Sequence, residues 1–517
     1  MINNPWSNQR RVVPRWRTLE ITLQAGELRT LRQVAEKSDD GTISPELAKR
    51  LERWRADPSL LTAGELVEAA IVAGREKEAV RAAQRLLQVD GRATPLLKEQ
   101  AGRLLLRAGA SKPWFKTEVS PQEAVSIWRA RTRLHPGDAL AWTELALQYT
   151  IHNRLDVALK AMLAALQLAP ENRHVLRSAV RFFLHLKDRE RAHDLLIRSA
   201  ATKYDPWLIA AELATADIAA RQPRFAKVAA KMLTDGGLYP RQTTEMAAAI
   251  ATLEMVSGNR KKAKRAFEAS MIDPTGNAVA QAEWASPQFG GILVPVSRLE
   301  SVSEPSEALA FHRFAERRYS EVPKFCEVWA HEEPYSIRPY EFGSQSAAAA
   351  GDYGVALELA IRGLKQRPGA SRLGNSAAFA LASMNRTAEA ITALAAINAK
   401  EHDDESRLVS LANLGLIAFR EGRTDEGSAA YNEAIDGFRR QGARSSEAVA
   451  RIYLAREAQG AQLPNAQALL DTAADAWAKI DRAPHHVLEQ IRADRDVQTA
   501  TATSKPLFTA SHQVRLL

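Results

Sequence analysis

Small residues recur along this chain at a fixed spacing of 34 residues, and this period limits the possible fold more than any other feature. One set of these positions comprises Ala124, Ala158, Ala192 and Ala226, and a second set comprises Val322, Ala356 and Ala390. Prolines that stop helices keep the same spacing, at Pro136 and Pro170 and again at Pro334 and Pro368. A period of this length indicates a repeat array rather than one globular core.

The segment from Ala139 to Asn172 shows what is repeated. A first predicted helix carries side chains on one face at spacings of three, one and three, namely Trp142, Leu145, Ala146 and Tyr149. After a tight connection near residues 152–155, a second predicted helix carries Ala158, Met162 and Ala165. A small residue at the start of the second helix lets the two helices approach closely. The sequence therefore predicts pairs of short antiparallel helices.

This order of residues resembles the tetratricopeptide repeat (TPR) almost position for position, and the resemblance covers roughly residues 60–285 and 303–480. It implies an all-α, TPR-like α-solenoid, which is a right-handed superhelix of antiparallel helix pairs. Each pair buries its apolar face against its neighbours, because one pair alone cannot do so. The resemblance also implies a concave groove, lined by the first helices, that holds protein partners.

The repeat pattern lapses after Trp284, so we expect two arrays separated by an irregular insertion. The expected parts are a basic arm with capping helices at 1–59, a first array at 60–285, an irregular linker at 286–302, a second array at 303–495 and a flexible tail at 496–517. Within the linker, the run from Ile292 to Val296 is too apolar to be free in solvent. We therefore expect this run to be extended and packed between the arrays.

Composition restricts the class of protein. The chain has 70 Lys and Arg against 61 Asp and Glu, a formal net charge of +9, which permits an acidic partner without requiring one. Cys326 is the single cysteine, so neither an intrachain disulfide nor a cysteine-based zinc site can form. No stretch reaches the roughly 18 apolar residues of a membrane helix. The first residues also lack the apolar core of a signal peptide, so a cytoplasmic location is expected.

Catalytic motifs are missing from the sequence. It contains neither a GxxxxGK[ST] phosphate loop nor a GxSxG nucleophile elbow. The run His331–Glu333 lacks the second histidine of a zinc-protease motif, and Pro334 ends the helix there. His485 and His486 are adjacent, and adjacent residues on a helix point about 100° apart, which makes a poor metal chelate. We therefore predict a non-enzymatic protein with no cofactor and no metal.

Basic and titratable side chains mark one face of the predicted helix at residues 173–185. The face carries His174, Arg177, Arg181 and His185 at spacings of three, four and four, and TPR geometry implies that it points into the groove. The second array offers Arg338, Arg372 and Asn375 at comparable places. We predict a basic pocket for an acidic segment or a C-terminal carboxylate, with Arg177 and Arg181 as bidentate donors. The alternative is a solvated helix face without a ligand.

The first eighteen residues differ from the rest in having tryptophans and arginines without acidic residues. The residues concerned are Trp6, Arg10, Arg11, Arg15, Trp16 and Arg17. One interpretation is an arm that docks on nucleic acid or another anionic surface, where guanidinium groups pair with phosphates and indoles stack on bases. The other is a terminal extension that lays its tryptophans on the first repeat and caps the open end of the solenoid, or that has no fixed structure.

Three hypotheses about function follow from these features. We favour a protein-binding scaffold or adaptor that holds partner proteins in TPR grooves, as the recognition or assembly subunit of a larger, bacterial-type complex. A second hypothesis is a regulator or sensor in which a peptide or small ligand changes the superhelix. A third is a nucleic-acid-associated subunit that binds through the basic arm.

Overall fold

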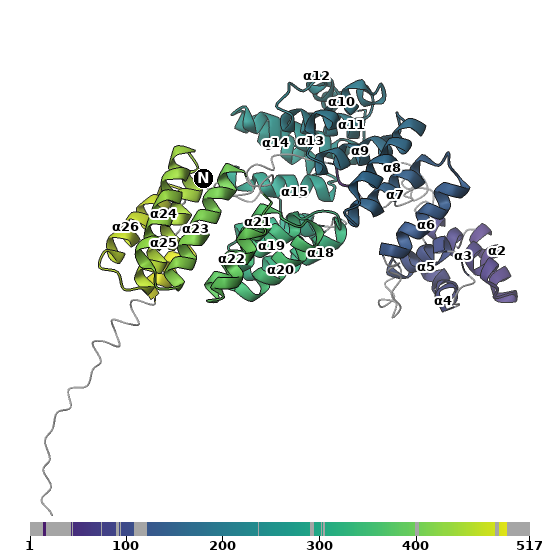
Figure 1. Ribbon diagram of the computed structural model, residues 1–517. Coiled ribbons are helices and arrows are strands. Elements are labelled where there is room, and N and C mark those ends of the chain that lie inside the picture. Colours follow the sequence, from purple (N-terminus) through teal and green to yellow (C-terminus); the bar gives the residue numbers. More distant parts are fainter. Residues whose placement is uncertain are drawn as a thin grey trace, which may run out of the picture. The chain divides into compact units, whose positions relative to one another are not determined.

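The computed structural model describes residues 14–16, 43, 45–73, 75–88, 93, 95–107, 121–235, 237–289, 294–300, 302, 305–398, 403–480 and 485–493 of the 517-residue chain. Within these ranges every regular element is helical (Figure 1). The predicted all-α fold class of TPR-like helix pairs is confirmed. The expected flexible tail at 496–517 lies outside the described residues.

The chain divides into two compact units. The small unit comprises residues 18–134, and the large unit comprises residues 1–17 together with residues 135–517. In sequence, the small unit is therefore inserted between two segments of the large unit. The predicted boundary between two arrays at residues 286–302 concerns a different division, inside the large unit, and it stays a prediction.

The small unit consists of short helices around one apolar core. Its helices are α2 (Pro45–Ala56), α3 (Leu60–Ala73), η1 (Glu76–Ala79), α4 (Val80–Gln88), α5 (Pro95–Arg107) and α6 (Pro121–Leu134). Leu47, Leu66, Leu86 and Leu104 are fully or almost fully buried in this core. Helix α2 begins with Pro45, a residue whose fixed φ suits the first turn of a helix.

The large unit is built from a series of first helices, each of which contacts the next or the one before it along the chain. These first helices are α7 (Ala139–Ile151), α9 (Arg173–His185), α11 (Pro206–Ile218), α13 (Pro240–Val256), α15 (Gly276–Ala285), α17 (Ser306–Ala315), α19 (Arg338–Ala349), α21 (Ser371–Ser383), α23 (Asp404–Arg420) and α25 (Arg444–Gly460). Four helices of this series, α9, α15, α17 and α19, contribute side chains to the candidate site.

Almost every first helix packs against a second helix that follows it in the chain. The second helices are α8 (Leu155–Leu168), α10 (Arg189–Arg198), α12 (Ala226–Thr234), α14 (Arg260–Ser270), α18 (Val322–Glu332), α20 (Tyr353–Gln366), α22 (Thr387–Ala395), α24 (Thr424–Arg440) and α26 (Ala466–Ala478). The exception is α15, which is followed by the short elements η3 (Ser286–Phe289) and α16 (Val296–Glu300) and packs on α17.

Local sequence explains the tight turns inside the pairs. Asn153, Lys187, Gly351 and Asn385 each have a positive φ, between 56° and 81°, two residues beyond the end of a first helix. A residue in this left-handed conformation ends a helix and reverses the chain, and glycine and asparagine reach it at the lowest cost. In the pair α19–α20, Asp352 is the N-cap of the second helix, and its side chain accepts a hydrogen bond from the Val355 N–H.

Most of the small residues found at 34-residue spacing lie where the helices of a pair meet. Ala158, Ala192, Ala356 and Ala390 are completely buried, and Val322 is too. Glycine takes this role in the pair α23–α24, where a Cβ on Gly427 would come within 2.9 Å of the Gly415 carbonyl oxygen. The small residues at this period therefore mark the places where paired helices contact closely, as predicted.

The predicted register fails at α12. Ala226 is only partly buried and Ala230 is exposed, whereas Phe225 and Ala229 face the core instead. The preceding first helix explains this shift, because α11 begins at Pro206, 33 residues after the start of α9 at Arg173. One residue fewer between these helices moves the buried positions one residue earlier.

The irregular segment after α15 is part of the core. All ten residues of α15 are buried. Val294, Leu299 and Val302 pack in the same cluster as Phe267 of α14. The run expected to be extended and packed is described only in part: Val294 is buried and Val296 begins α16, while residues 292 and 293 lie outside the described residues.

Candidate functional site

Residues 14–16, called the arm from here on, run without regular secondary structure against helices of the large unit. Arg15 Nη2 donates to Glu307 Oε2 at 2.6 Å and lies 3.5 Å from the carbonyl oxygen of Gly276. The backbone N–H of Trp16 donates to the Tyr335 hydroxyl at 3.4 Å. These partners follow the arm by 261 to 319 residues, so the contact is a long-range tertiary one.

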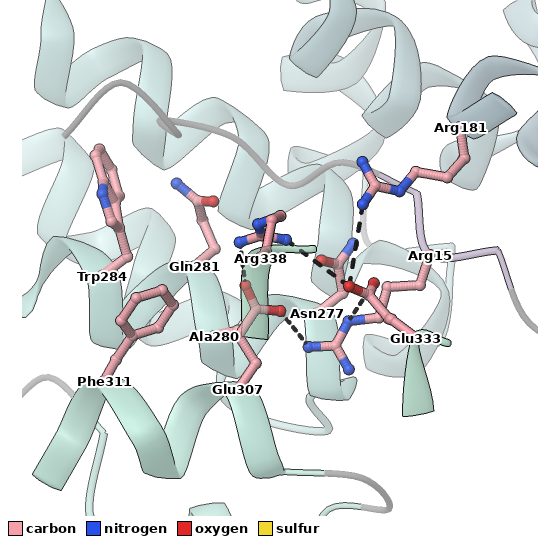
Figure 2. A pocket seen from close by; sticks show the side chains of 10 residues that line it. All are labelled: Arg15, Arg181, Asn277, Ala280, Gln281, Trp284, Glu307, Phe311, Glu333 and Arg338. Atoms are coloured by element: carbon pink, nitrogen blue, oxygen red, sulfur yellow. Dashed lines mark hydrogen bonds and ion pairs between the residues drawn. The ribbon is translucent and has the colours of Figure 1, made fainter. Parts of the chain in front are cut away.

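The Arg15 side chain enters a pocket, called the arginine pocket, that several helices build together (Figure 2). Its polar lining besides Arg15 comprises Arg181 of α9, Asn277 and Gln281 of α15, Glu307 of α17, Glu333 after α18 and Arg338 of α19. Apolar side chains from α15 and α17 complete it. The remaining cavity is about 20 Å³, which is room for one water molecule.

Local sequence explains where two of these side chains stand. Glu307 lies in the first turn of α17, where the helix dipole favours a carboxylate. Glu333 is the C-cap of α18, since Pro334 cannot continue that helix. The short connection to α19 then places Tyr335 and Arg338 next to the arm.

Three carboxylates surround the Arg15 guanidinium. Besides the contact with Glu307, Arg15 Nε lies 3.9 Å from Glu333 Oε1 and Nη1 lies 4.0 Å from Glu332 Oε2. The Arg15 side chain is only 6% exposed. Burial alone would lower the pKa of Arg15, but Glu307, Glu333 and Glu332 raise it above its usual value. Arg15 is therefore held as a buried cation.

Two further arginines share these carboxylates. Arg338 Nη2 donates to Glu307 Oε1, and Arg338 Nη1 and Arg181 Nη2 each lie 4.0 Å from Glu333 Oε2. Burial acts to raise the pKa of the Glu333 carboxyl, but Arg181, Arg15 and Arg338 together hold it below its usual value. The arrangement alternates positive and negative groups, and each buried charge is compensated by opposite charges.

Trp16 fills an aromatic slot next to the arginine pocket. Its ring centroid lies 5.7 Å from that of Phe182, at an interplanar angle of 72°, and 5.7 Å from that of Tyr335. The residue is 1% exposed. Arg181 stacks over the Tyr335 ring at 5.4 Å and donates from Nε to its hydroxyl at 2.9 Å. The slot and the pocket are thus connected through Tyr335 and Arg181.

The four predicted groove residues of α9 have partners within the chain. Arg177 donates to the Trp207 carbonyl at 3.0 Å and to Glu245 at 2.8 Å. His174 Nε2 lies 3.8 Å from Glu144 Oε1. His185 contacts the Tyr335 ring edge-on, and burial, with Arg181 nearby, lowers its pKa to about 4. An incoming acidic segment would have to compete with these contacts, and a partner-binding role for these residues stays a prediction.

The predicted groove residues of the second array do not come together. Arg338 lines the arginine pocket, whereas Arg372 and Asn375 of α21 do not. Asn375 takes part in a buried amide and hydroxyl network, in which it donates to the Ser406 carbonyl at 3.1 Å and accepts from Ser410 and Asn413. This network links α21 to α23.

The expected cap on the first repeat is not what Trp16 forms. Trp16 lies on Phe182 and Tyr335 in the large unit, because a slot there buries the whole indole. Arg15 is likewise paired with carboxylates and cannot contact phosphate while it is seated. The other predicted arm residues, Trp6, Arg10, Arg11 and Arg17, lie outside the described residues.

Sequence reasoning missed the carboxylates and the tyrosine that receive the arm. Glu307 and Tyr335 carry no motif, and Glu333 belongs to a run that was considered only as a metal site. The one available signal was charge complementarity between an arm without acids and the acidic pair before Pro334. In the described ranges no group of three His, Cys, Asp or Glu side chains is arranged to hold a metal ion. No described helix has the length and apolar character needed to cross a membrane.

Comparisons with known proteins include two distant structural likenesses. No family model matches the chain, and no curated protein matches it. Yeast Tom70 aligns with a TM-score of 0.33 and 13% identity, over 87% of this chain and 98% of that chain. A chain of the APC/C hetero-tetramer Cut9-Hcn1 aligns with a TM-score of 0.37 and 11% identity, over 91% of this chain and 96% of that one. At these values neither likeness bears on what this chain does.

Proposed function

We propose that this protein is a non-enzymatic scaffold that holds an extended segment of a partner protein on the inner face of its first helices. It would act as the recognition or assembly subunit of a larger complex. The observation that supports this proposal is the arm itself, a segment without regular secondary structure seated against α9, α15, α17 and the start of α19. A surface that holds one such segment by its side chains has the shape and polarity to hold another.

The size of the cavity favours a protein segment over a small molecule. The space beside the seated arm is about 20 Å³, whereas small-molecule sites are usually clefts of about 300–1,000 Å³. A protein segment that enters this surface replaces the arm side chain by side chain and needs no preformed empty cavity.

The experiment is affinity capture of the full-length chain from its native cell at moderate salt, with nuclease treatment in parallel. Captured proteins are then crosslinked and the crosslinks mapped by mass spectrometry. We expect a stoichiometric partner that survives nuclease and crosslinks to α9, α15, α17 or α19. A Lys262→Ala chain, which is altered at an exposed position of the second helix α14, is captured in parallel and should yield the same partner.

Two results would contradict the proposal. One is a partner whose crosslinks map only to second helices, because the inner face would then not be the binding surface. The other is recovery only of nucleic acid, or of proteins lost on nuclease treatment, since contacts that depend on phosphate would then explain the association.

A further inference from the structure

The charge balance of the arginine pocket depends on the arm. While the arm is seated, Arg15, Arg181 and Arg338 face Glu307, Glu332 and Glu333. Among the described residues, removing the arm takes one of three cations away from Glu307 and Glu333, whose side chains are 6% and 1% exposed. A buried carboxylate without full compensation is costly, so the vacant pocket favours entry of another cation.

The spread of carboxylates around the pocket favours a guanidinium, of which one nitrogen hydrogen-bonds Glu307 and the other two lie within ion-pair distance of Glu333 and Glu332. Arg15 contacts Glu307 through Nη2 while its Nε and Nη1 approach Glu333 and Glu332 from the same planar group. An arginine presents its donors in a fixed planar fork, whereas a lysine has a single ammonium centre. The carbonyl oxygen of Gly276 adds a further acceptor near Nη2.

The neighbouring slot selects an aromatic residue directly after the arginine. Trp16 is buried between Phe182 and Tyr335, and its ring meets Phe182 nearly edge-on. Aromatic rings prefer such offset or edge-on contacts, so the slot suits tryptophan, tyrosine or phenylalanine. Among the described residues the arm backbone makes one hydrogen bond, from the Trp16 N–H to Tyr335. Recognition therefore depends on the two side chains.

The arm fills this site imperfectly. Arg15 Nε, Arg15 Nη1 and Trp16 Nε1 are buried and have no hydrogen-bond acceptor among the described residues. A buried donor without an acceptor costs free energy. A segment that places the same two side chains with better hydrogen bonding can therefore displace the arm.

We propose that the arginine pocket and its aromatic slot form the ligand-selecting site of this protein, which binds an extended segment with an arginine followed by an aromatic residue. The chain's own arm occupies the site as an internal competitor. This inference rests on the proposed scaffold function and adds to it the class of partner and a built-in competitor. A partner must carry the arginine–aromatic pair and must displace the arm to bind.

The test uses the full-length chain and a fluorescein-labelled peptide with the sequence of residues 10–20, RRVVPRWRTLE. Arg15→Glu in the protein brings a fourth carboxylate to the pocket and should release the arm. We expect this variant to bind the peptide saturably, with an affinity about tenfold or more above that of the wild-type chain, as measured by fluorescence anisotropy.

Controls separate the pocket from general charge effects. A peptide with glutamate in place of its Arg15 should bind the Arg15→Glu chain about tenfold or more weakly, and so should the original peptide when Glu307→Gln is added to that chain. Arg50→Glu, which disrupts an ion-paired arginine of the small unit, should behave like the wild-type chain. Equal binding by the wild-type and Arg15→Glu chains, or no binding by a folded Arg15→Glu chain, would overturn the proposal.

A second measurement covers the case in which Arg15→Glu does not fold. Hydrogen exchange of the Trp16 amide is followed in the wild-type chain as the peptide is added. We expect exchange to accelerate about tenfold or more as the peptide replaces the arm. If exchange stays constant up to millimolar peptide, the arm is a permanent part of the core and the proposal fails.

The outcomes also separate this inference from the proposed function. If the wild-type and Arg15→Glu chains capture native partners equally, the scaffold function is still supported. The proposal that the arm competes with partners is then contradicted. A different result is that the Arg15→Glu chain binds the peptide but no native partner is found on the inner face. That result would support the selectivity of the pocket and contradict the scaffold function.

Discussion

At the scale of the residue, the molecule depends on buried charges that compensate one another. Glu333 is 1% exposed and lies within ion-pair distance of Arg15, Arg181 and Arg338. Trp329 Nε1 also donates to it at 3.2 Å. A buried carboxylate surrounded by three arginines is sensitive to loss of its charge, even when a substitution preserves its shape.

Replacing this carboxylate by its neutral isostere tests the point. We expect Glu333→Gln to lower the free energy of unfolding of the large unit by about 3 kcal/mol, because three arginines lose part of their compensation. Denaturant unfolding followed by hydrogen exchange measures the change. Glu426→Gln is the control, since Glu426 pairs with Arg423 at the surface and its loss should cost less than about 1 kcal/mol. Equal effects of the two substitutions would contradict the expectation.

A histidine pair near the C-terminal end of the described chain makes stability depend on pH. Burial lowers the pKa of His485 to about 3 and that of His486 to about 4, and Arg317 adds to both shifts. In the unfolded chain both groups have an ordinary pKa of about 6.5. As the pH falls below 6.5, protons therefore bind the unfolded chain first. The stabilising contribution is present at neutral pH and is lost toward pH 4.

We expect the large unit of the wild-type chain to lose stability between pH 6.5 and pH 4. The double variant His485→Gln, His486→Gln should lose less over the same range, by on the order of 2 kcal/mol after allowance for solvent screening. Thermal melts across this pH range measure the difference. Parallel pH profiles of the two chains would show that these histidines titrate alike in the folded and unfolded states.

Sequence reasoning found four residues of the candidate site. It predicts Arg15 and Trp16 as binding residues of an arm, and Arg181 and Arg338 as groove residues, but it assigns them to separate sites. Helical spacing places side chains on a face, and this is why Arg181 could be found. Glu307 meets the arm across 292 residues, and no local pattern reports a contact of that range.

At the scale of the element, close approach of paired helices is the recurring device. Gly415 of α23 and Gly427 of α24 face each other, and a Cβ on Gly427 would lie 2.5 Å from the Phe419 ring and 2.9 Å from the Gly415 carbonyl oxygen. The backbones are therefore too close for any side chain there. The 34-residue period predicts the same kind of contact at Ala158, Ala192, Ala356 and Ala390, and Gly427 continues the series after a slip of three residues. The period fails at α12, because α11 begins 33 rather than 34 residues after the start of α9.

Gly427→Ala tests whether the helix contact limits this position. In an open helix position alanine stabilises relative to glycine by up to about 1 kcal/mol. Here we expect destabilisation of about 1–3 kcal/mol, because the added methyl group overpacks the pair. Gly102→Ala in α5 is the matched control, since nothing lies within 4 Å of its added Cβ. Denaturant unfolding of both variants gives the comparison, and stabilisation by both would rule out the close contact.

At the scale of the whole molecule, the arm connects parts of the large unit that are far apart in sequence. Residues 14–16 contact side chains or carbonyl groups from α9, α15, α17 and the α18–α19 connection. The small unit has a separate core. The two units should therefore respond differently when the arm is lost.

Trp16→Ala measures that difference. Truncating a buried tryptophan typically costs about 3–5 kcal/mol. We expect this loss in the large unit, seen as faster hydrogen exchange in α9, α17 and α19, with exchange in α3 and α4 unchanged. Faster exchange in both units would mean that they unfold together, and unchanged exchange in α9 would mean that the indole does not stabilise that helix.

The distance in sequence between the arm and its pocket also sets an order of events during synthesis. Ribosomes add about 5–20 residues per second, and Tyr335 follows Trp16 by 319 residues. Residues 14–16 therefore leave the ribosome some tens of seconds before the pocket that receives them is complete. When the pocket forms, the arm is already present on the same chain. Each newly made molecule thus meets its own arm before it meets any partner protein.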